Sequence, residues 1–278
     1  MDFSLRSLAA VLNLGVTTQL TKTATLRRWE YCQSIDEPCC IESMVEALHD
    51  YVSDRSALEK SFGNSSAKIH LAGHGVSGII ALLYAQQYPE QIASLTLLSV
   101  AARPAVNWQA HYYALRQLLP CSRAMILAQM TRLLFGQQPA RFTKALSQLL
   151  ANDLDSNITL HSLAHHTQIA PGALRVPVLV CNGEVDAIAG PRDAGDWQRW
   201  RAHVLSSDDP SPETNPFPSE ASRLWHCPGG NHFFHFYHAA EVAKMMRTHW
   251  QDTKQTAPSR CLSSVEQRSV SHRITQLA

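Results

Sequence analysis

A short apolar segment that runs into a glycine-flanked turn and then into a helix constrains this chain most. Residues 68–72 are partly β-branched and are followed by glycines, which is typical of a buried strand. The turn covers 73–78, and the apolar stretch 79–88 behind it predicts a helix. A second buried strand is predicted at 95–100. A strand, a helix and a strand with such short connections predict two parallel strands joined by a right-handed crossover.

The rest of the core continues this alternation of helices and strands. Apolar residues recur at helical spacing from Ile41 to Val52 and predict a helix there. The stretch 206–222 is rich in Ser, Pro, Asp and Glu, which predicts a surface loop. Two further strands and two further helices are predicted, the strands at 176–181 and 223–227 and the helices at 193–202 and 239–250.

One long stretch interrupts the alternation. From 103 to 173 the apolar residues repeat only at helical spacing, so an all-helical insertion is predicted. The N-terminal residues show no clear pattern apart from a candidate strand at 26–32, and the polar residues at the other end predict a flexible tail. The chain therefore divides into an N-terminal segment, a two-part α/β core, a helical insertion and a tail, at 1–40, 41–102 with 174–250, 103–173 and 251–278.

Charge and cysteine content exclude several functional classes. The 278 residues include 24 basic and 23 acidic side chains, which gives a formal net charge of +1. Nucleic-acid binding needs a basic excess or a clustered basic face, so no nucleic-acid partner is expected. The seven cysteines contain no C-x-x-C pair, which disfavours a disulfide framework or a zinc ribbon and predicts a cytoplasmic location. No apolar run reaches the length of about 20 residues that a membrane span needs.

Three segments carry a family resemblance in combination. The first is 69–100, with Gly-His at its turn. The second leads from the strand at 176–180 into Gly-Glu-Val-Asp at 183–186, and the third is Cys-Pro-Gly-Gly-Asn-His at 227–232. Together they resemble the α/β-hydrolase superfamily of the cap-containing AB hydrolase-1 type, over roughly residues 41–250. The resemblance implies an α/β fold with a mostly parallel sheet flanked by helices, in which 103–173 is the helical cap.

The resemblance also assigns catalytic positions, in the order nucleophile, acid, histidine. The acid falls on Asp186, the histidine on His232 and the nucleophile on Gly75. In such a triad the imidazole takes the proton of a hydroxyl, and the carboxylate orients the imidazole. Gly75 has no side chain and cannot form an acyl-enzyme, and loss of a nucleophilic serine costs on the order of 10⁶ in kcat. Glycine does suit the positive φ of the turn, which costs other residues about 1–3 kcal/mol.

The chain departs from the family in two further ways. The pattern G-x-S-x-G is replaced by Gly-His-Gly-Val-Ser at 73–77. Such enzymes take one oxyanion-hole donor from a His-Gly-containing loop after an early strand. Segment 1–40 contains no buried strand followed by a glycine-rich loop, so the first strands of the usual sheet are expected to be missing or rewritten.

No other side chain is expected to replace the serine. Ser77 lies two positions further on, where a rotation of about 200° turns it away from His232, and we interpret it as a small residue that lets helix and strand approach. Cys181 and Cys227 lie within strands and are expected to be buried core thiols. A water molecule activated by His232 is the more plausible nucleophile.

Closely spaced histidines raise the question of a metal site. His232, His235 and His238 are three residues apart, with His226 nearby, and imidazole is the commonest metal ligand. No carboxylate or thiolate joins them at a recognised metal-site spacing, and aromatic residues fill the gaps. We therefore expect no metal and no cofactor. A structural or solvated role is also expected for three histidines of the insertion, His161, His165 and His166.

The leading functional hypothesis is a degenerate hydrolase that binds a small apolar or amphipathic ligand, or a protein partner. His74 and Val76 at the turn and Trp108 and Tyr112 in the insertion are the candidate binding residues. His111 and Tyr113 belong to the same aromatic cluster. Packing of the insertion against the core explains that cluster at least as well.

Two other hypotheses stay open. In the first, the chain is an active hydrolase or a cofactor-independent acid–base enzyme, in which His232 oriented by Asp186 activates water or substrate. Under the leading hypothesis this pair supports weak activity at most. In the second, the chain is a protein–protein interaction module that docks through the helical insertion.

Overall fold

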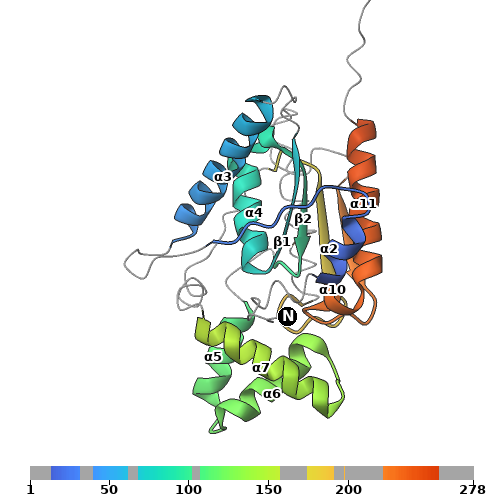
Figure 1. Ribbon diagram of the computed structural model, residues 1–278. Helices are drawn as coiled ribbons and strands as arrows, with labels where there is room; N and C mark the ends of the chain where they lie inside the picture. The colour runs from blue at the N-terminus through green and yellow to red at the C-terminus, as the bar shows by residue number, and fades with distance from the viewer. Residues whose placement is uncertain are drawn as a thin grey trace, which may run out of the picture.

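A parallel sheet of four strands forms the core of the protein in a computed structural model (Figure 1). The strands lie side by side in sequence order, and each neighbouring pair is parallel. All four strands predicted from the sequence are confirmed, with ends that differ by a few residues. They are β1 (Ile69–His74), β2 (Ile92–Leu98), β3 (Val178–Gly183) and β4 (Arg223–Cys227). The structure describes residues 14–31, 40–61, 68–101, 107–156, 174–190, 197 and 222–256.

Helices cover both faces of this sheet (Figure 1). One face is covered by α3 (Ile41–Ser61) and α4 (Val76–Gln87). The other is covered by α2 (Leu14–Leu20), α10 (Phe234–Tyr237) and α11 (Ala239–Thr256). Because both faces are buried, the central strands are nearly continuous apolar runs, as expected for a parallel sheet.

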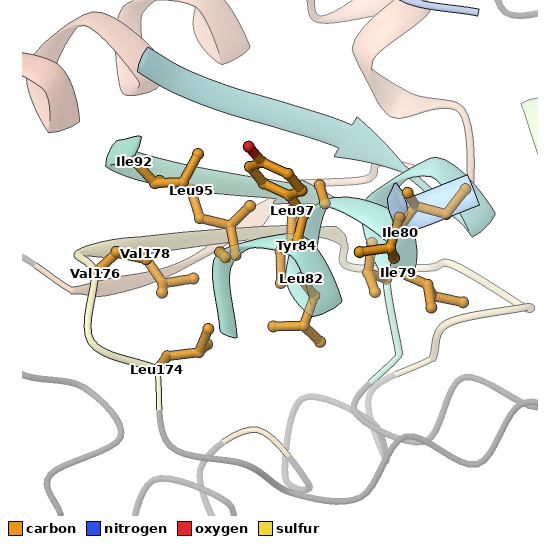
Figure 2. Close-up of a cluster of buried hydrophobic side chains, with 14 of the residues drawn as sticks. Ile79, Ile80, Leu82, Tyr84, Ile92, Leu95, Leu97, Leu174, Val176 and Val178 are labelled. Atoms are coloured by element: carbon orange, nitrogen blue, oxygen red, sulfur yellow. The ribbon is translucent and has the colours of Figure 1, made fainter. Parts of the chain in front are cut away.

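Side chains of the central strands alternate between two apolar clusters. Leu97 of β2 packs under α3 and α4, where it meets Tyr84 of α4 (Figure 2). The next residue, Leu98, belongs to the cluster under α2 and α11. Val180 and Cys181 of β3 divide in the same way. This period of two fixes the register of the sheet, since a slip of one residue would exchange the two clusters.

Among the described residues, three helices lie between β2 and β3 in the chain and gather at one end of the sheet (Figure 1). We call α5 (Trp108–Leu118), α6 (Arg123–Phe135) and α7 (Ala140–Ser156) the helical insertion. Its helices pack on one another around their own apolar cluster, which includes Met130, Leu134 and Leu150. The predicted helical character is confirmed for the described part, and 157–173 lies outside the described residues.

Several sequence expectations need correction at the ends of the chain. Residues 26–31 of the candidate strand at 26–32 form no strand. The N-terminal segment contributes α2 instead, which packs against α11. The predicted tail begins too early, because α11 continues through residues 251–256.

Other expectations fall on parts of the chain that the structure does not describe or describes only in part. The predicted helix at 193–202 and loop at 206–222 lie outside the described residues apart from Trp197 and Ser222. Each helix within the described part of the chain is too short or too polar to cross a membrane.

Candidate active site

The turn between β1 and α4 has the backbone geometry of a nucleophile elbow, with glycine at its centre. We call residues 73–77 the elbow. Gly75 has φ 53° and ψ −123° and precedes the first residue of α4. Its N–H donates to the carbonyl of Leu98 in β2, at 3.1 Å, which fixes the elbow at the carboxyl edge of the sheet. The helix packs closely behind it: a Cβ at Gly78 would lie 2.3 Å from Cγ2 of Val100.

Ser77 braces the elbow. Its hydroxyl donates to the carbonyl of His74 at 2.8 Å and accepts from the N–H of His74 at 3.0 Å, and the residue is exposed. Gly78 makes the close approach to Val100, and the prediction that Ser77 lets helix and strand approach stays a prediction. The single Oγ of Ser77 makes both bonds, so its hydroxyl is committed to the backbone of the turn.

Asp186 and His232 come together at the same edge of the sheet, after β3 and β4. Nδ1 of His232 lies 3.0 Å from Oδ2 and 3.2 Å from Oδ1 of Asp186, and each residue is only 2% exposed. Oδ1 also accepts the N–H groups of Ile188, at 2.8 Å, and Ala189, at 3.0 Å. Burial alone would raise the pKa of Asp186, but the neighbouring His232 and these hydrogen bonds lower the pKa below its usual value.

This hydrogen bond also sets the tautomer of His232. A carboxylate accepts only, so Nδ1 of His232 carries a proton toward Asp186, and Nε2 is the acceptor whenever the imidazole holds a single proton. Among the described residues, Nε2 of His232 has no hydrogen-bond partner. The arrangement is that of a general base whose orienting carboxylate is in place.

Ser99, which the sequence analysis missed, holds the backbone of His232. It follows β2, is 2% exposed and has φ 48°, the one positive φ of a non-glycine residue in the described part of the chain. Its hydroxyl donates to the carbonyl of His232 at 2.6 Å, and its N–H donates to the carbonyl of Cys181 at 2.9 Å. A strained backbone held by two buried hydrogen bonds is frequent near functional sites. Its position directly after a buried strand was the feature of the sequence that could have identified Ser99.

The amino-acid sequence of this chain is similar to those of two cyanobacterial proteins. No family model matches the chain. The uncharacterized protein sll0249 of Synechocystis sp. is 36% identical over 233 residues, which cover 84% of this chain and 82% of that protein. The uncharacterized protein alr2406 of Nostoc sp. is 34% identical over 232 residues, with coverages of 84% and 82%. The chain forms one family with these two cyanobacterial proteins.

Solved structures give the fold. MGS-M2, an α/β-hydrolase enzyme from a Medee basin deep-sea metagenome library, matches with a TM-score of 0.56 at 16% identity, over 79% of this chain and 74% of that one. The chain therefore has the α/β-hydrolase fold. A thermophilic esterase from Thermogutta terrifontis has a TM-score of 0.59 at 18% identity, with coverages of 91% and 88%. A meta-cleavage product hydrolase from Pseudomonas fluorescens IP01 has a TM-score of 0.62 at 11% identity, over 88% of this chain and 86% of that one.

A cluster of histidines lies beside the elbow. The ring of His74 lies 4.8 Å from that of His232 and 4.7 Å from that of His235, between centroids. Nε2 of His74 also lies 3.2 Å from the carbonyl oxygen of His232. Burial and the neighbouring histidines lower the pKa of His74, and burial followed by His232 lowers the pKa of His235 to about 3. His111 of the insertion has a lowered pKa for the same two reasons.

The closely spaced histidines at 226, 232, 235 and 238 do not form a single group in the structure. His232 and His235 join the cluster at the elbow, whereas Nδ1 of His238 lies 2.7 Å from Oε2 of Glu241 at the surface. His226 is exposed on β4. Within the described ranges, no group of three or more metal-ligating side chains has the arrangement of a metal site. The three histidines of the insertion, at 161, 165 and 166, lie outside those ranges.

The helical insertion packs directly on the two loops that carry Asp186 and His232. Trp108 and Tyr112 are each 5% exposed and share a cluster with Ile188, two residues after Asp186, and with Phe233, the residue after His232. The N–H of Phe233 donates to the carbonyl of Leu134 in α6, at 3.0 Å. The aromatic residues predicted to line a pocket thus pack between insertion and core, which is the alternative that the sequence left open.

A cavity of about 230 Å³ lies between the end of α6 and the loop before α10. Phe135 and Gln137 line one side of it, and Asn231 and Phe233 line the other. Its walls contain neither Gly75 nor His232, so it is separate from the elbow.

Two strand cysteines are buried, as predicted. Cys181 and Cys227 are free thiols with no exposed surface. Burial raises the pKa of Cys181 far above its usual range and that of Cys227 to about 11. Because the thiolate is the nucleophile, neither residue is suited to replace a serine at neutral pH.

Proposed function

We propose that this protein is a degenerate α/β-hydrolase that binds a small, largely apolar ligand next to the Asp186–His232 pair. Hydrolysis, where it occurs, is weak and uses water. The observation that carries the proposal is the contrast between Gly75 at the elbow and an intact, buried acid–histidine pair beside it. Without a hydroxyl at position 75 no acyl-enzyme forms, so the triad mechanism does not operate. Nε2 of His232 remains able to take a proton from water.

The polarity of the site supports an uncharged ligand. The lowered pKa values of His74 and His235 keep both imidazoles neutral at pH 7. Phe233 and the apolar cluster of the insertion adjoin the pair on the other side. We propose that the insertion acts as the cap over this site, held on the core by the buried Trp108 and Tyr112. The cytoplasmic location predicted from the cysteine pattern stays a prediction.

Hydrolysis of a panel of neutral activated esters tests the proposal. We expect the wild type to show slow turnover without a burst, since no acyl-enzyme accumulates. His232→Ala should reduce this rate to background. His226→Ala, which removes an exposed histidine of β4 that is not part of the buried pair, is the matched control and should keep the wild-type rate. A burst in the wild type, or full turnover in His232→Ala, would overturn the water mechanism.

An active acid–base enzyme is the second candidate function. The observation in its favour is that Asp186 fixes the tautomer of His232 while Nε2 stays available. Under this alternative some substrate is turned over at an ordinary enzymatic rate, with kcat of about 1 s⁻¹ or more. Under the main proposal, no compound in the panel reaches that rate.

A docking role for the insertion is supported by its exposed apolar side chains. Leu118 at the end of α5 is 76% exposed, and Met125 in the first turn of α6 is 62% exposed. Co-purification of a partner that is lost in Leu118→Ser would favour this role over ligand binding.

A further inference from the structure

We infer that the ligand of this site carries a hydroxyl group, which sits over Gly75 and donates a hydrogen bond to Nε2 of His232. The ligand is otherwise uncharged. This inference rests on the proposed function and names the chemical class of its ligand. The ligand hydroxyl would occupy the place that a serine hydroxyl has in other members of the superfamily.

The first observation is space over the elbow. A Cβ built on Gly75 would meet no atom of the described residues within 4 Å. The elbow itself is half-buried at Gly75 and at its two neighbours, whereas Asp186 and His232 are each 2% exposed. Among the described residues, glycine therefore leaves room over the elbow for a group of about the size of a side chain, next to His74, whose ring lies 4.8 Å from that of His232.

The second observation is the hydrogen-bonding character of the site. Nδ1 of His232 is committed to Asp186, which leaves Nε2 as an acceptor. A ligand group that satisfies Nε2 must therefore be a hydrogen-bond donor. A carboxylate or a plain ester carbonyl cannot serve, because each of them only accepts.

The third observation is charge. An ammonium group also donates, but a buried ammonium needs a carboxylate partner. Both oxygens of Asp186 are already engaged by His232, and Oδ1 also accepts two backbone N–H groups. His74 and His235 supply no negative charge either. A hydroxyl is the donor that meets the acceptor without adding an unpaired charge, and an apolar remainder suits the aromatic surroundings at Phe233.

Four compounds of similar size and different head group form the test: phenethyl alcohol, propylbenzene, phenethylammonium and phenylacetate. Nitrogen NMR of the full chain with labelled histidines reports on Nε2 of His232 during each titration. We expect a saturable shift of the Nε2 resonance with phenethyl alcohol. Propylbenzene should bind about tenfold more weakly and leave that resonance in place. The two charged compounds should not bind measurably.

The matched variants are Gly75→Ala and Gly229→Ala. Both glycines have positive φ, 53° and 63°, and at neither would a Cβ meet any described atom within 4 Å, so the two changes impose similar backbone strain. Gly75→Ala places a methyl group in the inferred hydroxyl position and should weaken phenethyl alcohol binding about tenfold. Gly229→Ala should leave the affinity within about twofold of wild type.

The outcomes separate the inference from the proposed function. Equal affinity for propylbenzene and phenethyl alcohol would overturn the hydroxyl inference and leave a purely apolar site. Unchanged alcohol affinity in Gly75→Ala, or preferred binding of either charged compound, would also overturn it. Failure of the proposed function itself would be seen separately, as ester turnover that is unaffected by His232→Ala.

Discussion

The elbow and the two loops that face it lie at the same edge of the sheet, but the elbow presents backbone where the loops present a pair of buried side chains. The elbow keeps the backbone, with Gly75 at φ 53°, and has no reactive side chain. The loops keep the side chains, because Asp186 and His232 are paired and buried. Their hydrogen bonds also serve the fold: Asp186 accepts the N–H groups of Ile188 and Ala189. Retention of the pair is therefore explained by stability as well as by chemistry.

The largest effect is expected for Asp186→Ala, which tests how much the Asp186–His232 pair contributes to the free energy of unfolding. Asp186→Ala removes a carboxylate whose side chain has no exposed surface and leaves Nδ1 of His232 and two backbone N–H groups without their partner. We expect the free energy of unfolding to fall by about 3–5 kcal/mol in urea denaturation. Glu241→Ala, which breaks the surface pair with His238, should cost less than about 1 kcal/mol. A loss below about 1 kcal/mol for Asp186→Ala would leave chemistry as the reason for its presence.

The next effect concerns the uncharged histidines beside the elbow. The pKa of His235 falls from 6.5 to about 3 on folding, so the unfolded chain binds a proton below pH 6.5 that the folded chain does not. The part of the free energy of unfolding that is linked to this lowered pKa is therefore present in full above pH 6.5 and is lost as the pH falls toward 3. The slope approaches about 1.4 kcal/mol per pH unit for this residue. Urea midpoints between pH 7 and 5 should show this loss, and His235→Phe should flatten the curve. An identical curve for the variant would contradict the burial argument.

The smallest effect tests the brace on the His232 backbone. Ser99→Ala removes the hydroxyl that donates to the carbonyl of His232 and keeps the positive φ. We expect a loss of about 1 kcal/mol or somewhat more in the free energy of unfolding. Ser99→Gly removes the same hydrogen bond but relieves the strained φ, so its loss should be smaller. The order of the two variants in thermal denaturation is the measurement, and a larger loss for glycine would show that φ 48° carries no strain.

Features that depend on a short stretch of sequence could be predicted, and features that depend on tertiary contacts could not. Each strand ends in its own turn or loop, so the positions of β1 to β4 follow from local patterns, whereas the meeting of Asp186 with His232 was implied by the family resemblance. Ser99 was missed because its contact is with a residue 133 positions away in the chain. His74 was identified only as a binding candidate. Its packing against His235 required the fold, since His74 ends β1 and His235 lies in α10. The roles assigned to these residues stay predictions.

Labelling with a fluorophosphonate tests most directly whether the elbow lacks only its hydroxyl. The substitution Gly75→Ser places a hydroxyl beside His232, in a space where no described atom lies within 4 Å of the new Cβ, at a backbone cost of about 1–3 kcal/mol. Intact-mass analysis should show no site-specific adduct on the wild type and one adduct at position 75 in the variant. Adding His232→Ala should abolish that adduct, whereas Gly229→Ser should remain unlabelled. A wild-type adduct that depends on His232, or an unlabelled but folded Gly75→Ser, would contradict the account.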